Sequence, residues 1–180
     1  EAIPSPEEAL AHMMDQGYTH VAVQSLHTIA GQEFHELSKN VKAFENMAGP
    51  IKEIRTGYPL LSTQADIEAV CEAVIANIPE ERDKDEAVVL MGHGTHHPAN
   101  AFYAALMFNL QLKDPNIFVG TVEGWPELGE IQDMLEEEEI EKAYLMPFMS
   151  VAGDHAMNDM AGSGGDSWKS VLTDAGIKCV

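Results

Sequence analysis

The sequence predicts an α/β protein in which parallel sheets are flanked by helices, arranged as two similar lobes. Strand-like apolar runs alternate with segments of helical periodicity along the chain, which is typical of βα units and parallel sheets. A pattern also recurs, because 20–31 and 142–153 both contain an apolar strand, a short linker, a β-branched residue and Ala-Gly. Two related lobes would explain this repeat.

The repeat also predicts that the first lobe is incomplete. Two strands and two helices precede the second copy, whereas the first copy begins too near residue 1 to be preceded by a matching β-α-β. We therefore expect a partial N-terminal lobe at 1–80 and a C-terminal lobe at 81–180. This chain would then be a fragment of a longer polypeptide, or the missing part would be supplied separately.

Capping and breaking residues predict the elements of the first lobe. Ser5 suits an N-cap, Pro6 suits the first helical position and Gly17 suits a helix end. Thr63 is a second N-cap, before a run of apolar residues with helical spacing. The expected elements are a helix at 6–16, a strand at 20–26, a helix at 31–47, a strand at 51–55 and a helix at 63–78.

The second lobe begins with a fully apolar run at 87–91, which is typical of a strand buried on both faces. The expected elements are strands at 87–91, 117–121, 142–146 and 177–180, and helices at 100–112, 127–138 and 166–174.

The charge of the chain excludes two classes of partner. Ten Lys and Arg against 30 Asp and Glu give a net charge of -20, which disfavours nucleic acid and anionic membranes. Such a surface attracts cations, although simple solubility is the preferred explanation. If the ligand is itself acidic, local cations must offset this charge, and Lys52, Arg55 and Lys113 are candidates.

The cysteines and the hydropathy pattern set further limits. The two cysteines form no C-x-x-C pattern, so neither a disulfide framework nor a thiolate zinc site is indicated. No apolar run reaches the ~18 residues that span a bilayer, and no signal peptide is visible. The chain starts at Glu1 without a methionine. Upstream processing or truncation, and with it an exported form, therefore stays open beside a cytoplasmic default.

Three successive strand ends of the second lobe carry residues suited to metal binding. His93 follows the strand at 87–91 between two glycines, Glu123 follows the strand at 117–121, and His155 comes after the strand at 142–146. Active sites of open parallel sheets lie at the carboxyl ends of strands. Two imidazoles and one carboxylate suit Co²⁺, Ni²⁺, Fe²⁺ or Zn²⁺ rather than Mg²⁺ or Ca²⁺, and they leave a coordination position open.

Each of these residues also has a structural interpretation. His93 could hydrogen-bond within its turn, and Glu123 could be a solvated loop acid. Asp154 and Asp159 could orient the His155 imidazole or cap a helix start.

Three segments together resemble the anaerobic sirohydrochlorin cobaltochelatases of cobalamin biosynthesis. They are Met-Gly-His-Gly-Thr at 91–95, Gly-Thr-Val-Glu-Gly-Trp at 120–125 and Leu-Met-Pro-Phe-Met-Ser-Val-Ala-Gly-Asp-His at 145–155. These enzymes are class II tetrapyrrole chelatases, which share a two-lobed α/β fold with ferrochelatase. The resemblance extends to Gln24-Ser-Leu-His27 and to 158–162.

The resemblance implies an ATP-independent enzyme that inserts Co²⁺ into sirohydrochlorin, with Ni²⁺ or Fe²⁺ as alternative metals. It implies that His93 and His155 hold the metal and assist proton removal, that Glu123 completes the site, and that the macrocycle lies between the lobes. No Gly-x-x-x-x-Gly-Lys phosphate loop is present, which agrees with the absence of a nucleotide. The residues expected to contact the macrocycle are His27, Gly94, Thr95, Met149 and Ser150.

Several alternatives remain open. The same residues would serve a metal or tetrapyrrole carrier without turnover, and a zinc hydrolase would use the open coordination position to activate water. His35 is either an exposed histidine or an interface ligand for haem or a metal. The helix at 31–47, with its apolar face, predicts a homo-oligomer.

Overall fold

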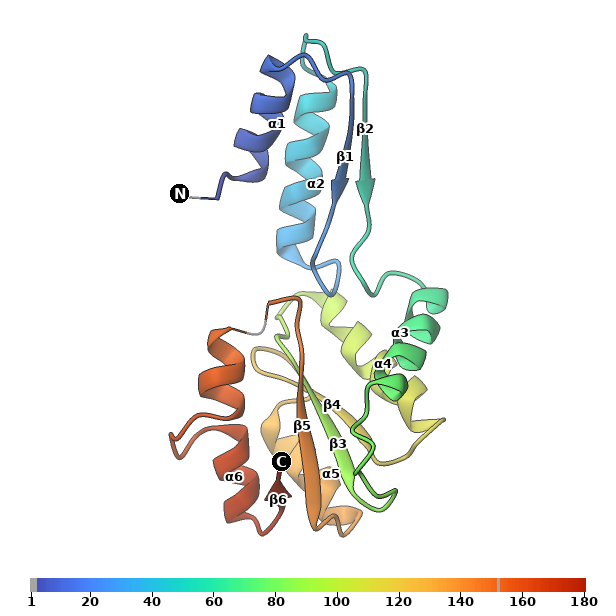
Figure 1. The fold of residues 1–180 in the computed structure, drawn as a ribbon, viewed down its shortest axis with the longest axis vertical. Coiled ribbons are helices and arrows are strands. Elements are labelled where there is room, and N and C mark those ends of the chain that lie inside the picture. Colours follow the sequence, from blue (N-terminus) through green and yellow to red (C-terminus); the bar gives the residue numbers. More distant parts are fainter. Residues whose placement is uncertain (1–2, 152) are drawn as a thin grey trace. The chain divides into compact units, whose positions relative to one another are not determined.

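The computed structural model of the chain describes residues 3–151 and 153–180 and has the predicted α/β class (Figure 1). It divides into two compact units between Ser62 and Thr63. No helix among the described residues is long and apolar enough to cross a membrane.

The first unit pairs two strands in parallel and covers them with two helices (Figure 1). Its core joins one apolar side chain from each element, namely Leu10, Val21, Val41 and Ile54. The elements are α1 (Pro6–Asp15), β1 (His20–Gln24), α2 (Gln32–Glu45) and β2 (Glu53–Gly57). The predicted start of α1 is confirmed, because Ser5 and Glu8 form a reciprocal capping box with Pro6 in the first turn.

The apolar face of α2 is used inside the first unit. Phe34 and Val41 are buried, and Leu37 and Phe44 pack against the core that Val41 shares with β1 and β2. This stripe was the basis for expecting an oligomer contact at 31–47. The stripe therefore contributes to the core of its own unit.

The second unit holds a four-stranded parallel sheet in the order β4-β3-β5-β6. Its strands are β3 (Ala87–Gly92), β4 (Ile117–Thr121), β5 (Lys142–Phe148) and β6 (Lys178–Cys179). Its helices are α3 (Gln64–Ala76), α4 (Ala101–Gln111), α5 (Leu128–Glu137) and α6 (Trp168–Asp174). Two short segments, the 3-10 helix η1 (Pro98–Asn100) and the π-helix η2 (Ala156–Met160), were not predicted.

The central strand β3 is buried along its whole length, as its apolar run predicts. Ala87, Val89 and Met91 belong to the core cluster that α5 and α6 complete with Leu135 and Trp168. The residues between them point to the opposite face, since side chains alternate along a strand. Helices therefore cover the sheet on both sides (Figure 1).

The unit boundary falls earlier than the lobe boundary predicted at residue 80. The helix α3 belongs to the second unit because it packs on α4, and the Gln64 amide donates to Asn109 Oδ1 at 3.2 Å. The first unit has two described strands in its sheet, against four in the second. In both units the strand of the repeated pattern pairs in parallel with the next strand, β1 with β2 and β5 with β6.

A buried ion pair joins the loops at the amino ends of β3 and β4. The Arg82 guanidinium contacts Asp114 Oδ2 at 2.5 Å and Oδ1 at 3.2 Å, and its side chain is 4% exposed. Burial raises the pKa of the Asp114 carboxyl. Hydrogen bonds from Arg82 and the Asn116 N–H, together with the Arg82 charge, outweigh burial and place this pKa below its ordinary value.

We expect Arg82→Met to lower the free energy of unfolding by about 3 kcal/mol at pH 7, because it leaves the partly buried Asp114 carboxylate without its cationic partner. The folded pKa of Asp114 is depressed, so the pair stabilises fully above the unfolded pKa of about 3.9 and loses its effect as pH falls through the folded pKa. Urea unfolding at pH 7 and pH 3 should therefore give a smaller difference at pH 3.

The matched control for this prediction is Arg55→Met. Arg55 pairs with Glu53 at 2.6 Å, but its side chain is 83% exposed. Exposed pairs contribute about 0–1 kcal/mol, so this variant should unfold almost as the wild type does. Equal losses in both variants would contradict a stabilising role for the Arg82 pair.

Candidate functional site

The strand order of the second unit brings the three predicted ligand positions to neighbouring strand ends. The strand β3 lies between β4 and β5, so the loops that carry His93, Glu123 and His155 leave adjacent strands at their carboxyl ends. After β3 the chain forms β4 on one side of β3 and later forms β5 on the other side. Ligands of open α/β sheets bind at such a topological switch point.

The first of these residues, His93, follows β3 directly and is about half exposed, with 49% of its side chain accessible. Its Nδ1 lies 3.0 Å from the Gly94 carbonyl oxygen. A carbonyl oxygen only accepts hydrogen bonds, so Nδ1 carries the proton and Nε2 holds the lone pair of the neutral ring.

Gly92 and Gly94, the glycines that flank His93, are required by close packing. A Cβ on Gly92 would overlap the buried Tyr103 ring. Gly94 has a φ of +80°, and a Cβ there would come within 2.6 Å of Thr121 Cβ and 2.7 Å of the Gly124 nitrogen. Neither position accepts a larger residue without movement of the loops.

Glu123 lies beside His93 because the two loops share backbone hydrogen bonds. The Glu123 N–H donates to the His93 carbonyl oxygen at 2.7 Å, and the Val122 N–H also reaches it, at 3.1 Å. The Glu123 carboxylate is 59% exposed, and its Oε2 lies 4.0 Å from His93 Nδ1. That distance is too long for a hydrogen bond, so the carboxylate is free to turn toward a cation.

The third residue, His155, is placed by the helical segment that leads into η2. Its ring centre lies 4.8 Å from that of His93, with the rings at 89° to each other. Its Nδ1 lies 2.5 Å from Asp159 Oδ2. A carboxylate that accepts this proton orients the ring and leaves the Nε2 lone pair available for a metal. Asp154 instead accepts from the Asn158 amide at 2.7 Å.

The spacing of the two imidazoles suits a shared ion. Imidazoles that bind one metal at about 2.1 Å have ring centres roughly 4.5–5.5 Å apart, which brackets the distance between His93 and His155. Among residues 3–151 and 153–180, however, no three His, Cys, Asp or Glu side chains are already arranged to hold a metal. His93 and Glu123 are half exposed, so turning them to close on an ion meets little steric resistance.

The other residues of the second unit that are predicted to contact the macrocycle differ in how far they are packed into the protein. Thr95 is tied into its own loop, because its N–H donates to Asn100 Oδ1 and its hydroxyl accepts from the His97 N–H. Met149 packs partly against the core cluster, whereas Ser150 is exposed. His97 accepts from the Ala99 N–H at 3.1 Å and thus caps η1.

The remaining predicted residues lie in the first unit. His27 follows β1, and its Nδ1 is 2.9 Å from the hydroxyl of the buried Ser25. His35 is exposed on α2, with its ring centre 6.2 Å from that of Phe34. Among the cationic candidates, Arg55 pairs with Glu53, and Lys113 follows α4 at the amino edge of the sheet, away from His93.

Sequence reasoning missed Asn100, which links the His93 and Glu123 loops. Its Oδ1 accepts from the Thr95 N–H at 3.0 Å and its amide donates to the Trp125 carbonyl at 2.6 Å. An asparagine at a predicted helix start resembles a cap, so no sequence signal separated this role from capping.

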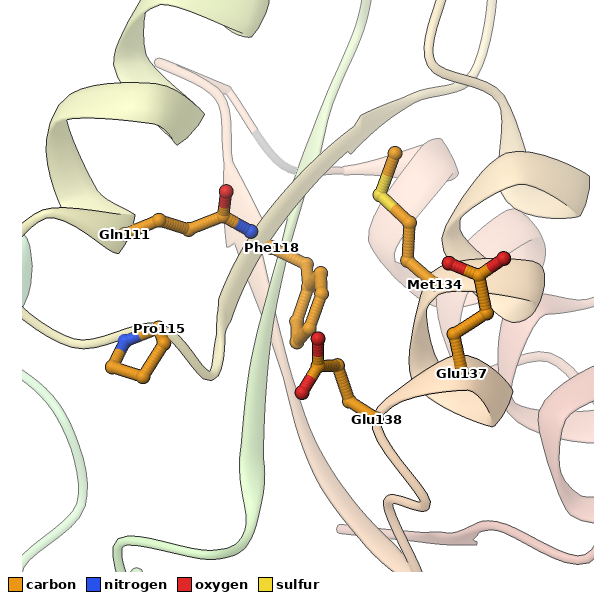
Figure 2. Close-up of a pocket in the computed structure, with 6 residues that line it drawn as sticks. All are labelled: Gln111, Pro115, Phe118, Met134, Glu137 and Glu138. Carbon is orange, nitrogen blue, oxygen red and sulfur yellow. The ribbon is translucent and has the colours of Figure 1, made fainter.

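A separate hollow of about 280 Å³ lies near the amino ends of the strands of the second unit (Figure 2). Phe118 of β4 and Met134 of α5 form part of it, and Glu137 and Glu138 bring two carboxylates to it (Figure 2). None of the predicted metal ligands lines this hollow, so it is distinct from the site at the carboxyl edge.

Comparisons with known proteins point to one family. The family described as Cobalt chelatase (CbiK) matches residues 2–180. Sirohydrochlorin cobaltochelatase CbiKC of Nitratidesulfovibrio vulgaris is 42% identical over 173 residues, which cover 96% of this chain and 61% of that protein. Sirohydrochlorin cobaltochelatase of Salmonella typhimurium (strain LT2) is 40% identical over 175 residues, which cover 97% of this chain and 65% of that protein. This chain thus spans less than two thirds of the length of either relative.

Proposed function

Because this chain belongs to the cobalt chelatase (CbiK) family, we propose that it inserts Co²⁺ into sirohydrochlorin, with His93, Glu123 and His155 at the metal. The observation that carries the proposal is the convergence of these residues on neighbouring strand ends, with the two imidazoles 4.8 Å apart. The names of the two relatives support the choice of metal and macrocycle.

The chemistry requires three tasks that these residues suit. The Co²⁺ substrate must lose water, stand over the ring and replace two pyrrole protons, which then need acceptors. The Nε2 atoms of His93 and His155 would hold the metal, because both Nδ1 atoms face oxygen acceptors. The solvated Glu123 carboxylate, beside His93, would accept a proton and pass it to water. No nucleotide enters this scheme.

The macrocycle contacts belong to the same proposal. Gly94 and Thr95 lie on the loop that carries His93, and Met149 and Ser150 lie on the loop that leads to His155.

An anaerobic absorbance assay tests the proposed activity. Sirohydrochlorin, Co²⁺ and the full chain are mixed without nucleotide, and the spectral change of metallation is followed against a protein-free control. Faster metallation with turnover supports the chelatase. Stoichiometric binding of the macrocycle without product would identify a carrier. Zinc retained through purification with ester or amide hydrolysis would identify a hydrolase.

The orientation of His155 gives a further prediction. We expect Asp159→Asn to lower the metallation rate about 10-fold or more, because the amide can donate to Nδ1 and so favour the wrong tautomer of His155. Initial rates at saturating Co²⁺ measure this effect. Asp154→Asn is the matched control, since Asp154 contacts Asn158 and not His155. Equal rates in both variants would remove Asp159 from the site.

Two further expectations complete the proposal. We propose Ni²⁺ and Fe²⁺ as competing metals, because the ligand set accepts them, and competition assays rank the three ions.

We also propose a homo-oligomer, with the exposed His35 on α2 as a haem or metal ligand at its contact. Light scattering measures the mass, and a monomer without a haem Soret band in the purified chain would reject both parts.

A further inference from the structure

Asn100 occupies the junction between η1 and α4, where its side chain bridges two loops. The side-chain oxygen accepts from the Thr95 N–H at 3.0 Å, and the side-chain nitrogen donates to the Trp125 carbonyl at 2.6 Å. Thr95 lies two residues after His93, and Trp125 lies two residues after Glu123. One primary amide thus joins the loops of two proposed metal ligands.

The packing around Asn100 leaves little freedom for the bridge. A Cβ on Gly124 would overlap Asn100 Oδ1 and would come within 2.9 Å of the Thr95 nitrogen. Gly124 therefore lets the second loop lie directly against the amide. The same loops also meet at the ligand residues, where the Glu123 N–H donates to the His93 carbonyl at 2.7 Å. The two loops are thus joined at the ligand pair and again two residues further along each loop.

The helix start does not require this side chain. At the first turn of α4 the Asn100 side chain makes no capping hydrogen bond, and its backbone is already helical, with φ of -55° and ψ of -28°. Both hydrogen-bonding groups of the amide are directed to the loops instead. An amide carries its acceptor and its donor on two separate atoms, whereas an ionised carboxylate only accepts and a hydroxyl has one oxygen for both roles.

We propose that Asn100 is a positioning residue that fixes the spacing of His93 and Glu123 for Co²⁺. This inference rests on the proposed function, since it assumes that both side chains bind the metal. Loss of the amide would remove the link between Thr95 and Trp125 and leave the two loops joined only through backbone hydrogen bonds to the Gly92 and His93 carbonyl oxygens. Co²⁺ would then meet two ligands at variable distances, which weakens metal capture more than the later steps.

The test measures Co²⁺ binding by the full chain, using the visible absorption of the bound ion, and separately KM for Co²⁺ and kcat of metallation. We expect Asn100→Ala to raise both the Kd and the KM for Co²⁺ about 10-fold, with a smaller change in kcat. Asn109→Ala is the matched control, because Asn109 lies on the same helix and donates to the Ala105 carbonyl at 2.8 Å. It should bind Co²⁺ as the wild type does.

A double-substitution cycle separates positioning from general stability. If Asn100 acts through Glu123, then Asn100→Ala should weaken Co²⁺ binding little in a Glu123→Ala background, since the positioned ligand is already gone. Additive losses in the double variant, or an unchanged Kd in the single variant, would overturn the inference. Should Asn100→Ala fail to fold, Asn100→Ser, which is too short to reach both loops, is measured in the same way.

Failure of the proposed function gives a different result. A wild-type chain that binds Co²⁺ but does not metallate sirohydrochlorin would reject the chelatase activity. The double-substitution cycle, measured by Co²⁺ binding, would still decide whether Asn100 acts through Glu123.

Discussion

His93→Ala and His155→Ala are each expected to slow Co²⁺ insertion into sirohydrochlorin about 100-fold or more. Each substitution removes one of two imidazoles whose centres lie 4.8 Å apart, and with it a metal ligand and a proton acceptor. The remaining imidazole and Glu123 would hold Co²⁺ weakly and without a fixed direction. Initial rates over a range of Co²⁺ concentrations measure the loss.

The fold should tolerate both substitutions. The side chain of His93 is 49% exposed and that of His155 is 28% exposed, so truncation leaves no large internal cavity. Thermal unfolding of each variant should therefore stay close to that of the wild type. His12→Ala is the matched control, because His12 lies on α1 and contacts Gln16. Rates of His93→Ala and His155→Ala that equal those of His12→Ala would remove the catalytic assignment.

The positions proposed for the metal could be predicted because they follow from strand ends. A fully apolar run such as 87–91 must be buried on both faces, so the residue after it emerges at the carboxyl edge. The same reasoning places Glu123 after β4. What the sequence could not supply is the order of the strands. Only the central position of β3 makes the three ends neighbours.

Other features depended on contacts that leave no sequence pattern. Helix α3 has strong caps and helical spacing, but its packing on α4 decides which unit it joins. The π-helix η2 arises in a segment rich in Met, Asn and Asp with no clear periodicity. The role of Asn100 depends on the Thr95 N–H and the Trp125 carbonyl, which come within 3.0 Å of the Asn100 side chain only when the loops are folded.

Helix α2 shows how tertiary packing decides what an apolar stripe does. The spacing of Phe34, Leu37 and Val41 predicted an apolar face, and that face exists. It packs on the sheet of its own unit. A stripe of this width is what any surface helix needs to dock on its own core, so the pattern alone could not distinguish the two uses.

Gly94→Ala should both destabilise the second unit and abolish metallation. Its φ of +80° costs an L-residue about 1–2 kcal/mol. The added Cβ would also come within 2.6 Å of Thr121 Cβ and 2.7 Å of the Gly124 nitrogen. Because Thr121 is buried and Gly124 presents backbone, neither can move aside alone. The two costs together should lower the free energy of unfolding by about 2–4 kcal/mol.

The activity should fall for a separate reason. Relief of the overlap must push the His93 loop away from the Glu123 loop, so the surviving folded molecules would have misplaced ligands. Gly129→Ala is the matched control, since it lies in α5 with nothing within 4 Å of the added Cβ, and alanine is favoured in helices. Urea unfolding and metallation rates should show Gly129→Ala unchanged or slightly more stable. A Gly94→Ala variant with wild-type stability and rate would mean that the loops can separate freely, and the spacing of His93 and Glu123 would then not be set by their contact.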